Sequence, residues 1–401
     1  MNELGQIKVM CVFGTRPEAI KMAPLVLELK KCDKIQTIVC VTGQHREMLD
    51  QVLQVFSIVP DYNLKLMAAG QTLTDLTSRA LEKLDGVMKV VEPDLVLVHG
   101  DTTTSFVGAL AAFYNHIKIG HVEAGLRTYD IESPYPEEAN RQFISVLSNL
   151  NFAPTEESKN NLLREGKNPS SIVVTGNTAI DALKYTVRED YHNEDLEWAK
   201  GSRLLLLTAH RRENWGQPMK DIFHCIKRLL NDFPDIKIIY PVHPNPIVHD
   251  LAYEMLGNEP RVRLVAPLDV IDFHNFMAQS YFILTDSGGV QEEAPSLGKP
   301  VLVLRDTTER PEGVEAGTLR VIGTNEDGVY NNAKELLTNE KVYRSMSGAK
   351  NPYGDGFASQ RIVQAILDHF DESKTIESRE SSSTIKTTVV TKPENSIHGM
   401  N

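Results

Sequence analysis

Short apolar runs rich in β-branched residues alternate with longer amphipathic stretches through most of this chain. The runs are apolar throughout rather than at every second residue, which is typical of parallel strands covered by helices on both faces. The alternation runs through once and then begins again, so the sequence predicts an α/β fold with two successive open parallel sheets. The predicted strands span residues 7–13, 37–43, 94–101, 118–125 and 172–177 in the first unit, and 204–210, 236–243, 262–267, 281–286 and 300–305 in the second.

Turn-forming residues gather between the two units, around residues 166–178. We therefore predict an N-terminal domain over residues 1–172 and a C-terminal domain over residues 173–356, in line with a domain size of roughly 150 residues. Beyond residue 370 the chain is charged, rich in Ser and Thr, and almost without large apolar residues. Residues 371–401 are predicted to form a disordered tail.

The charge balance and the cysteines limit the partners and the compartment. The chain carries 54 acidic and 42 basic residues, a net charge of -12, which argues against binding to nucleic acid or to an anionic membrane surface. Its four cysteines show no CxxC spacing, so free thiols of a reducing compartment are expected. The first apolar run has only the length of a strand, not of a membrane span or a secretion signal. These features predict a cytoplasmic protein.

The residues that follow the predicted strands are rich in His, Arg and acidic side chains in both units. In an open parallel sheet, ligands bind beyond the carboxyl ends of the strands. Two such edges that face each other would form a ligand cleft between the domains. The strand-end segments are residues 14–18, 43–46, 99–102, 121–125, 210–213, 243–246, 286–289 and 305–310.

Ser287, Gly288 and Gly289 lie between a predicted buried strand and a helix. Glycines at a helix start leave backbone N–H groups open to an anion, and the helix dipole favours negative charge there, so a diphosphate would fit. The alternative is a simple glycine turn from strand to helix. Cations at the same edges favour the anion site, because an acidic protein has no general reason to place them there. They are Arg16, Lys21 and Arg310.

Several carboxylates occupy the same edges and are candidates for proton transfer. Asp101 and Glu123 each end a buried strand, and Glu137 follows a Ser-Pro-Tyr-Pro turn. Apolar walls favour the protonated form of such a carboxyl group and a nearby Arg favours the charged form, which is how acid and base partners are tuned. Asp101 could instead cap the helix that follows it, and Glu137 could be an ordinary first-turn acid, as could Glu18 and Glu138. Glu123 has the weakest purely structural explanation.

Other chemistries find little support in the sequence. The segment GTRPEA has one glycine where the dinucleotide fingerprint GxGxxG needs three, so no nicotinamide or flavin cofactor is expected. His243 and His249 are six residues apart and flank prolines, which does not predict a metal site. No GxSxG elbow or Cys/His pair suggests an acyl-enzyme. We predict an enzyme without cofactor or metal.

Long motifs in this order make the chain recognisable: VFGTRPEAIKMAPL, TGQHREMLDQVL, LVHGDTTTS, GHVEAGLRT, PEEANR, GNTAIDAL, TAHRREN, YPVHPNP, LTDSGGVQEEAPSLGKPVLVLRDTTERPE and NPYGDG. From about residue 7 to residue 370 the sequence closely resembles the bacterial non-hydrolysing UDP-N-acetylglucosamine 2-epimerases. The resemblance implies a glycosyltransferase-B type fold, with two Rossmann-like domains around a cleft. It also implies that a last helix, over residues 357–370, crosses back onto the first domain.

The resemblance implies the interconversion of UDP-N-acetylglucosamine and UDP-N-acetylmannosamine without a cofactor, by a homodimer that supplies precursors for cell-surface polysaccharide. UDP would be eliminated across C1–C2 to leave 2-acetamidoglucal, and then added back with the C2 proton on the other face. Matching the motifs residue by residue gives three sets. The implied catalytic residues are Asp101, Glu123, Glu137 and His210. The implied substrate-binding residues are Arg16, Lys21, Phe273 near uracil, Ser287, Gly288, Gly289, Glu293 at the ribose, and Arg310. The implied activator site contains Gln44, Arg46, Gln71, Glu138, Arg211 and His243.

Three other functions fit the same architecture, because a fold does not decide a function. A nucleotide-sugar glycosyltransferase would consume the sugar only with an acceptor. A hydrolysing epimerase would release free N-acetylmannosamine, and a sensor would bind the ligand without changing it. The carboxylates at positions 101, 123 and 137 argue against the sensor.

Overall fold

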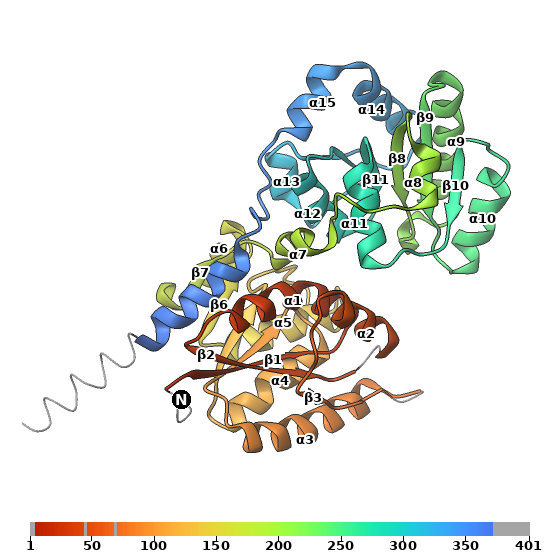
Figure 1. Ribbon diagram of the computed structural model, residues 1–401. Helices are drawn as coiled ribbons and strands as arrows, with labels where there is room; N and C mark the ends of the chain where they lie inside the picture. The colour runs from red at the N-terminus through yellow and green to blue at the C-terminus, as the bar shows by residue number, and fades with distance from the viewer. Residues whose placement is uncertain (1–4, 44–45, 68–69, 372–401) are drawn as a thin grey trace, which may run out of the picture.

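Two α/β units make up the molecule. The computed structural model describes residues 5–43, 46–67 and 70–371. Figure 1 shows an N-terminal unit, coloured red to yellow, and a C-terminal unit, coloured green to blue, with α7 (Thr178–Thr186) between them. Each unit is a parallel sheet flanked by helices, so the predicted α/β fold with two open sheets is confirmed. No helix in the described part of the chain is long and apolar enough to cross a membrane.

The N-terminal unit contains a seven-stranded sheet in the order β3-β2-β1-β4-β5-β6-β7, with every pair parallel. Its strands are β1 (Ile7–Phe13), β2 (Ile35–Val41), β3 (Tyr62–Asn63), β4 (Leu95–His99), β5 (Lys118–Val122), β6 (Leu150–Ala153) and β7 (Ile172–Val174). Its helices are α1 (Arg16–Lys30), α2 (Arg46–Val55), α3 (Leu73–Val91), α4 (Thr103–Tyr114), α5 (Glu137–Leu147) and α6 (Glu156–Arg164).

The C-terminal unit contains a six-stranded parallel sheet in the order β10-β9-β8-β11-β12-β13. Its strands are β8 (Arg203–Thr208), β9 (Ile236–Pro241), β10 (Val262–Val265), β11 (Phe282–Thr285), β12 (Val301–Val303) and β13 (Leu319–Val321). Its helices are α8 (Glu194–Ala199), α9 (Gln217–Asp232), α10 (Pro246–Leu256), α11 (Val270–Gln279), α12 (Gly288–Glu293), α13 (Pro311–Glu315), α14 (Glu326–Thr338) and α15 (Glu340–Ser347).

The strand order reverses once in each sheet, between β1 and β4 in the first and between β8 and β11 in the second. At such a point the loops from neighbouring strands leave toward opposite faces, which opens a crevice at the carboxyl edge. Asp101 and His210 lie in the loops after β4 and β8, Lys21 lies in α1 after β1, and residues 286–289 lead into α12 after β11. The topology therefore brings the main candidate residues to the two crevices.

Both faces of the central strands are buried, which explains their largely apolar runs. In β1, Val9, Cys11 and Phe13 belong to one core cluster while Met10 and Val12 belong to the cluster on the other face. Such alternation is the two-residue period of a strand. With both faces covered, that period does not appear as an alternation of apolar and polar residues in the sequence.

The chain ends by returning to its first unit. Residues 358–371 form a helix, and its Ile362, Val363 and Ile366 are buried in the core cluster around β1 and α1. Figure 1 shows this last helix, in blue, lying against the N-terminal unit beside β7. The predicted crossing helix is thus present, one residue further along than expected. The rest of the predicted tail lies outside the described residues.

The sequence did not predict three of the described strands, and the predicted domain boundary lies inside a strand. The missed strands β3, β6 and β13 are short, and β6 follows a polar Ser-Asn pair. The predicted domain boundary between residues 172 and 173 falls inside β7, which pairs with β6 of the first sheet. We propose instead that the N-terminal domain includes β7 and that the chain crosses over between Val174 and Thr178.

Candidate active site

A cleft of about 850 Å³ lies between the carboxyl edges of the two sheets. Ionisable side chains from both units line it, as expected for a polar substrate. From the N-terminal unit they are Glu18, Lys21, His99, Asp101, Glu123, Arg127, Asp130 and Arg141, and from the C-terminal unit they are Arg211, Glu213, Arg305, Glu309 and Arg310.

Glu123 is a largely buried carboxylate of the N-terminal wall, with 9% of its side chain exposed. It follows β5 with a φ of 64°, in the left-handed region that is rare for a residue with a side chain. Lys21 donates a hydrogen bond to its Oε1 atom, and His99 Nε2 lies 3.8 Å from its Oε2 atom. A Cβ atom on Gly100 would lie 3.3 Å from the same Oε2 atom. The local backbone therefore holds this carboxylate close beneath the loop that follows β4.

The charge of Glu123 is stabilised by its neighbours. Burial raises the pKa of its carboxyl group, but the ammonium group of Lys21 together with His99 and Arg310 outweighs that effect and holds the pKa below its ordinary range. Burial likewise lowers the pKa of Lys21, and the charges of Glu123 and Glu292 raise it above its usual value. Burial also lowers the pKa of His99, with the carboxylate of Glu123 opposing that shift. The site thus contains a buried ion pair beside a neutral imidazole.

Asp101 stands beside Arg141 on the same wall. Arg141 donates to Asp101 Oδ2 at 2.5 Å and lies 3.2 Å from Glu138. Burial, with the charge of Glu123 adding to it and that of Arg141 opposing it, raises the pKa of Asp101. A raised pKa suits a group that must hold and release a proton near neutral pH. The helix-cap explanation of Asp101 was wrong, because Thr102 caps α4 by accepting from Ser105 N at 3.1 Å.

Glu18 organises the loops of this wall. Its buried carboxylate accepts hydrogen bonds from the backbone N–H groups of Gly14 and Thr15, at 3.0 and 2.7 Å. It also accepts from the hydroxyl groups of Thr102 and Ser105, at 2.6 and 2.8 Å. Glu18 therefore does more than stabilise a first helical turn, because it ties the loop after β1 to the start of α4.

Glu137, the third predicted catalytic carboxylate, is less well explained. It is the first residue of α5 and is half-buried. Within the described residues, its side chain makes no hydrogen bond or ion pair and does not line the cleft. Glu138 is the buried member of the pair and accepts from the backbone of Thr128 and Tyr129 at 3.0 and 3.2 Å. A catalytic role of Glu137 stays a prediction.

A second buried carboxylate, Asp286, organises the C-terminal wall. It accepts from the backbone N–H groups of His210 and Arg211 at 2.8 and 2.9 Å, and from Asn214 Nδ2 at 3.0 Å. Burial raises its pKa, but these hydrogen bonds and the adjacent imidazole lower it further, so the pKa lies below its usual range. His210 Nδ1 lies 3.1 Å from Asp286 Oδ1, which leaves the other ring nitrogen for a substrate.

The start of α12 lies beside two guanidinium groups. A Cβ atom on Gly288 would lie 3.7 Å from Arg310 and 4.0 Å from Arg211, so the missing side chain leaves room between the backbone and these cations. Ser287 makes no side-chain cap here, and its N–H donates to Thr285 Oγ1 at 3.0 Å. The Nε atom of Arg310 donates to Glu292, which orients the guanidinium. Backbone and cations together suit an anion.

The predicted base and ribose residues lie near one another. Glu293 Oε2 is 3.4 Å from His274 Nε2, and the neighbouring Phe273 is a half-buried member of the cluster between α11 and the sheet. Arg16, from the opposite unit, donates to the carbonyl oxygen of Leu268 at 3.3 Å. Lys21, predicted for the diphosphate, is paired with Glu123.

The predicted activator residues are spread over several environments. Arg211 lines the cleft, and the imidazole of His243 stacks on His210 with ring centroids 5.6 Å apart. Gln71 bonds to Arg79 at the start of α3. Gln44 lies outside the described residues, as does the side chain of Arg46. A second ligand site therefore stays a prediction.

Sequence reasoning missed several residues of the cleft. Arg305 is buried and donates to Glu213 and Glu309, at 2.6 and 2.9 Å. Asn177 donates to Glu123 at 3.1 Å and to Glu292 at 2.9 Å. A signal existed for both, since each is the last residue of a predicted strand. Arg141 had a weaker signal, one helical turn after Glu137. Among the described residues, no group of three or more His, Cys, Asp and Glu side chains could hold a metal ion.

Comparisons with known proteins point to one family. Residues 27–367 match the family model described as UDP-N-acetylglucosamine 2-epimerase. The UDP-N-acetylglucosamine 2-epimerase of Bacillus subtilis (strain 168) is 60% identical over 371 residues, which cover 92% of this chain and 98% of that protein.

Solved structures agree in fold as well as in sequence. A putative UDP-N-acetylglucosamine 2-epimerase from Listeria monocytogenes is 54% identical with a TM-score of 0.88, covering 92% of this chain and 97% of that one. The UDP-GlcNAc 2-epimerase of Neisseria meningitidis, solved bound to UDP-GlcNAc, is 48% identical with a TM-score of 0.82, covering 90% of this chain and all of that chain (100%).

Proposed function

The chain belongs to the UDP-N-acetylglucosamine 2-epimerase family, and on that premise we propose that it interconverts UDP-N-acetylglucosamine and UDP-N-acetylmannosamine. One observation carries the proposal. Buried carboxylates on one wall of the cleft face guanidinium groups and an open helix start on the other. An elimination that takes a proton from carbon and releases a diphosphate needs those two kinds of group within the length of one substrate.

The N-terminal wall would exchange the proton at C2. In the forward step a carboxylate takes the C2 proton, the C1–O bond to UDP breaks, and a C1–C2 double bond forms. In the return step a proton reaches C2 on the other face and a phosphate oxygen attacks C1, so no oxidant or reductant is consumed. Glu123, whose pKa is lowered, and Asp101, whose pKa is raised, supply two carboxyl groups with pKa values shifted in opposite directions. Each such group contributes about 10²–10⁴ in rate.

The C-terminal wall would bind the leaving UDP. Negative charge gathers on the phosphate as the C1–O bond breaks, and fixed donors stabilise it without reorganising. Arg310, already oriented by Glu292, and the N–H groups at the start of α12 are the donors that suit this charge. His210, with one ring nitrogen beside Asp286, would donate from the other. Glu293 would hold the ribose and Phe273 the uracil ring.

Incubation with UDP-N-acetylglucosamine in deuterated water tests the proposal. We expect the manno product with deuterium at C2, observed by NMR, without an added acceptor or cofactor. Hydrogen retained at C2 in that product would exclude the elimination route. Consumption of the sugar only in the presence of an acceptor would indicate a glycosyltransferase instead. Release of free N-acetylmannosamine would indicate the hydrolysing reaction.

The outer face of α4 and α5 supports a homodimer. Phe113, Tyr114, Phe143 and Val146 are all more than half exposed there, at 53, 60, 52 and 77%. These two helices pack side by side, and Phe143 contacts Phe106 of α4 with ring centroids 5.3 Å apart. Four large exposed apolar side chains on two neighbouring helices are more than a monomer ordinarily leaves uncovered. A second copy of the chain would cover them through a self-complementary contact.

Sedimentation of variants tests the dimer. Val146→Asp places a charge in the centre of the proposed interface, and the particle should sediment as a monomer. Tyr253→Ser is the matched control, because Tyr253 is an exposed aromatic residue of α10, in the other unit. A dimer that survives V146D would place the interface elsewhere.

The cysteines support a cytoplasmic location. Cys11, Cys40 and Cys225 are buried and free, and burial raises the pKa of each thiol to about 12. Thiols that stay protonated and unpaired are ordinary in a reducing compartment. Fractionation of cells that make the tagged protein would test the location.

A further inference from the structure

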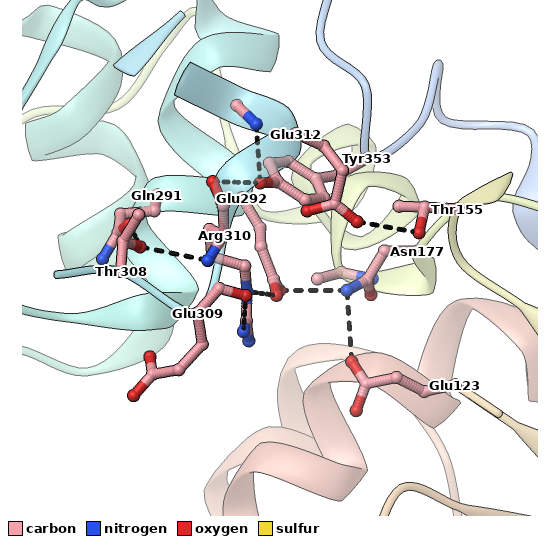
Figure 2. A network of polar contacts seen from close by, with 12 residues as sticks. Glu123, Thr155, Asn177, Gln291, Glu292, Thr308, Glu309, Arg310, Glu312 and Tyr353 are labelled. Atoms are coloured by element: carbon pink, nitrogen blue, oxygen red, sulfur yellow. Dashed lines mark hydrogen bonds and ion pairs between the residues drawn. The ribbon is translucent and has the colours of Figure 1, made fainter. Parts of the chain in front are cut away.

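Asn177 lies between two carboxylates that come from opposite units. It follows β7 at the point where the chain crosses over, and only 3% of it is exposed. Its Nδ2 atom lies 3.1 Å from Glu123 Oε1 and 2.9 Å from Glu292 Oε2, as Figure 2 shows. Its Oδ1 atom accepts from Ala179 N at 2.9 Å and caps α7. The side chain thus joins both walls of the cleft to the crossover helix.

The partners determine which way the amide points. An ionised carboxylate can only accept and a backbone N–H can only donate, so the nitrogen must face the two glutamates and the oxygen must face α7. Both amide hydrogens are then used, one for each carboxylate. A flipped amide would set its oxygen against two carboxylates, which is unfavourable in a buried site.

The charges alternate along the line that passes through Asn177. Lys21 pairs with Glu123, and Arg310 pairs with Glu292. Lys21 Nζ is also 3.9 Å from Glu292 Oε2, so the two ion pairs lie close to each other. Lys21 offsets part of the repulsion between the two carboxylates, and the two N–H bonds of the Asn177 amide offset more of it. The neutral amide therefore allows both ion pairs to stay charged in the same small volume.

We propose that Asn177 is a positioning residue that couples diphosphate binding at Arg310 to the carboxylate of Glu123. The inference rests on the proposed function, in which these two groups act at opposite ends of one elimination. A diphosphate beside Arg310 competes with Glu292 for the guanidinium, and Glu292 then draws more strongly on the Asn177 amide. Because Asn177 also donates to Glu123, it keeps that carboxylate in place while Glu292 releases Arg310, so the base stays aligned with C2 when the leaving group is bound.

Two substitutions separate this role from that of a simple helix cap. Asn177→Ser and Asn177→Asp both keep an oxygen that caps α7, and Ser, Asp and Asn cap helices about equally well. Ser removes both donors to the carboxylates, whereas Asp adds a third carboxylate between them. If Asn177 acts only as a cap, both variants should behave like the wild type. If it couples the two ion pairs, kcat should fall in the order wild type, N177S, N177D.

The expected effect of N177S is a drop in kcat of about 10- to 150-fold with little change in KM, the loss expected for one hydrogen bond to a charged group. N177D should lose more activity and should also bind UDP more weakly, because its charge lies near Arg310. Adding Glu292→Gln to N177D returns the number of carboxylates to two and supplies a new donor, so the double variant should recover part of both losses. Asn325→Asp is the matched control, since Asn325 caps α14 away from the cleft.

Calorimetric titration with UDP and steady-state kinetics together give a clear decision. Wild-type kcat in N177S and N177D, or an E292Q addition that recovers nothing, would overturn the inference while leaving the epimerase proposal intact. A wild-type protein that does not exchange the C2 proton would instead overturn the proposed function. In that case the order of UDP affinities still tests the role of Asn177 between the two carboxylates. N177D should bind UDP most weakly, and adding E292Q should restore part of the affinity. Thermal unfolding of each variant identifies any that fail to fold.

Discussion

The two walls of the cleft share one structural arrangement but carry different charged groups. In each, one buried carboxylate accepts backbone N–H groups from the loop after the strand at the crossover point. Glu18 does this for residues 14 and 15, and Asp286 does it for residues 210 and 211. Beyond this shared arrangement, the N-terminal wall carries two carboxylates that each form an ion pair, Glu123 with Lys21 and Asp101 with Arg141. The C-terminal wall places guanidinium groups around an open helix start.

The difference indicates which wall performs which part of the proposed reaction. A carboxylate that must exchange protons needs neighbours that set its protonation state, and the N-terminal wall supplies Lys21 and Arg141 for that purpose. A leaving diphosphate needs fixed positive charge, and the C-terminal wall supplies Arg310. Damage to one wall should therefore affect proton transfer, and damage to the other should affect UDP.

Glu123→Gln should show the largest effect and sharpen this comparison most. The amide keeps the shape of the side chain but can no longer accept a proton, so turnover should fall by about 10²–10⁴-fold. UDP affinity, measured by calorimetry, should change far less. Glu157→Gln is the control, because Glu157 is exposed and pairs with Arg164 on α6. If E123Q keeps normal turnover, Glu123 is not a catalytic residue, and the assignment of proton transfer to the N-terminal wall is wrong.

Arg310→Ala should come second and should affect both quantities. Loss of a fixed donor at the leaving group costs roughly 3–4 kcal/mol of transition-state stabilisation, or about 10²–10³-fold in kcat. UDP should also bind more weakly, unlike in E123Q. Arg310→Lys keeps the charge without the planar fork, and should recover only part of the loss. Unchanged UDP affinity in R310A would contradict the assignment of the C-terminal wall to the diphosphate.

Asp286→Asn tests the buried carboxylate that holds the loop after β8, not the groups that would react with the substrate. The amide sets an NH₂ group or a weaker acceptor against the N–H groups of His210 and Arg211, so the free energy of unfolding should fall by about 1–3 kcal/mol. The pKa of Asp286 is lower in the folded protein than its ordinary value. Its stabilising contribution is therefore complete at neutral pH and declines as the pH falls below about 3.9 toward the folded value.

Chemical denaturation of wild type and D286N across pH would check this dependence. The difference between them should shrink in acid. Glu18→Gln should give a similar loss from the other wall if the two buried carboxylates are equivalent. Asp235→Asn should change stability little, because its pair with Arg203 is 53% exposed on the Asp side and a surface pair contributes about 0–1 kcal/mol.

Glu312→Ala should have the smallest effect and tests how the walls meet. Glu312 of α13 accepts from Thr155 of the N-terminal unit at 3.0 Å, so the bond spans the two units (Figure 2). One hydrogen bond contributes about 0.5–1.5 kcal/mol net, which limits the rise in KM to about tenfold. Glu315→Ala on the same helix is the control. A large loss of kcat in E312A would mean that the contact between the two walls, rather than the charged groups on each wall, limits the reaction.

Much of the fold followed from the sequence because its signals are local. Each predicted strand is an uninterrupted apolar run, and the restart of the pattern at residue 204 showed two sheets. Glycines and charged residues after those runs marked the cleft, because the carboxyl ends of parallel strands share an edge. Lys21, Asp101, Glu123 and Arg310 all line it.

What the sequence could not show is the pairing between distant residues. Glu18 resembles an ordinary first-turn acid, and only the fold reveals that it binds Thr102 and Ser105. Asn177 resembles a plain helix cap, which it is, and its second role depends on two glutamates that lie 54 and 115 positions away in the chain. Short strands such as β3 and β13 carry too few residues for a pattern.

The returning helix has a consequence for how the protein is made. Ile362, Val363 and Ile366 complete the core around β1, yet they are synthesised after the whole C-terminal unit. While the ribosome is still translating, the N-terminal unit exposes the apolar groove that this helix later fills, whereas the second sheet already has all of its strands. The part of the chain that is made first is therefore finished last, and nascent chains that stop before residue 358 should depend on chaperones to shield that groove.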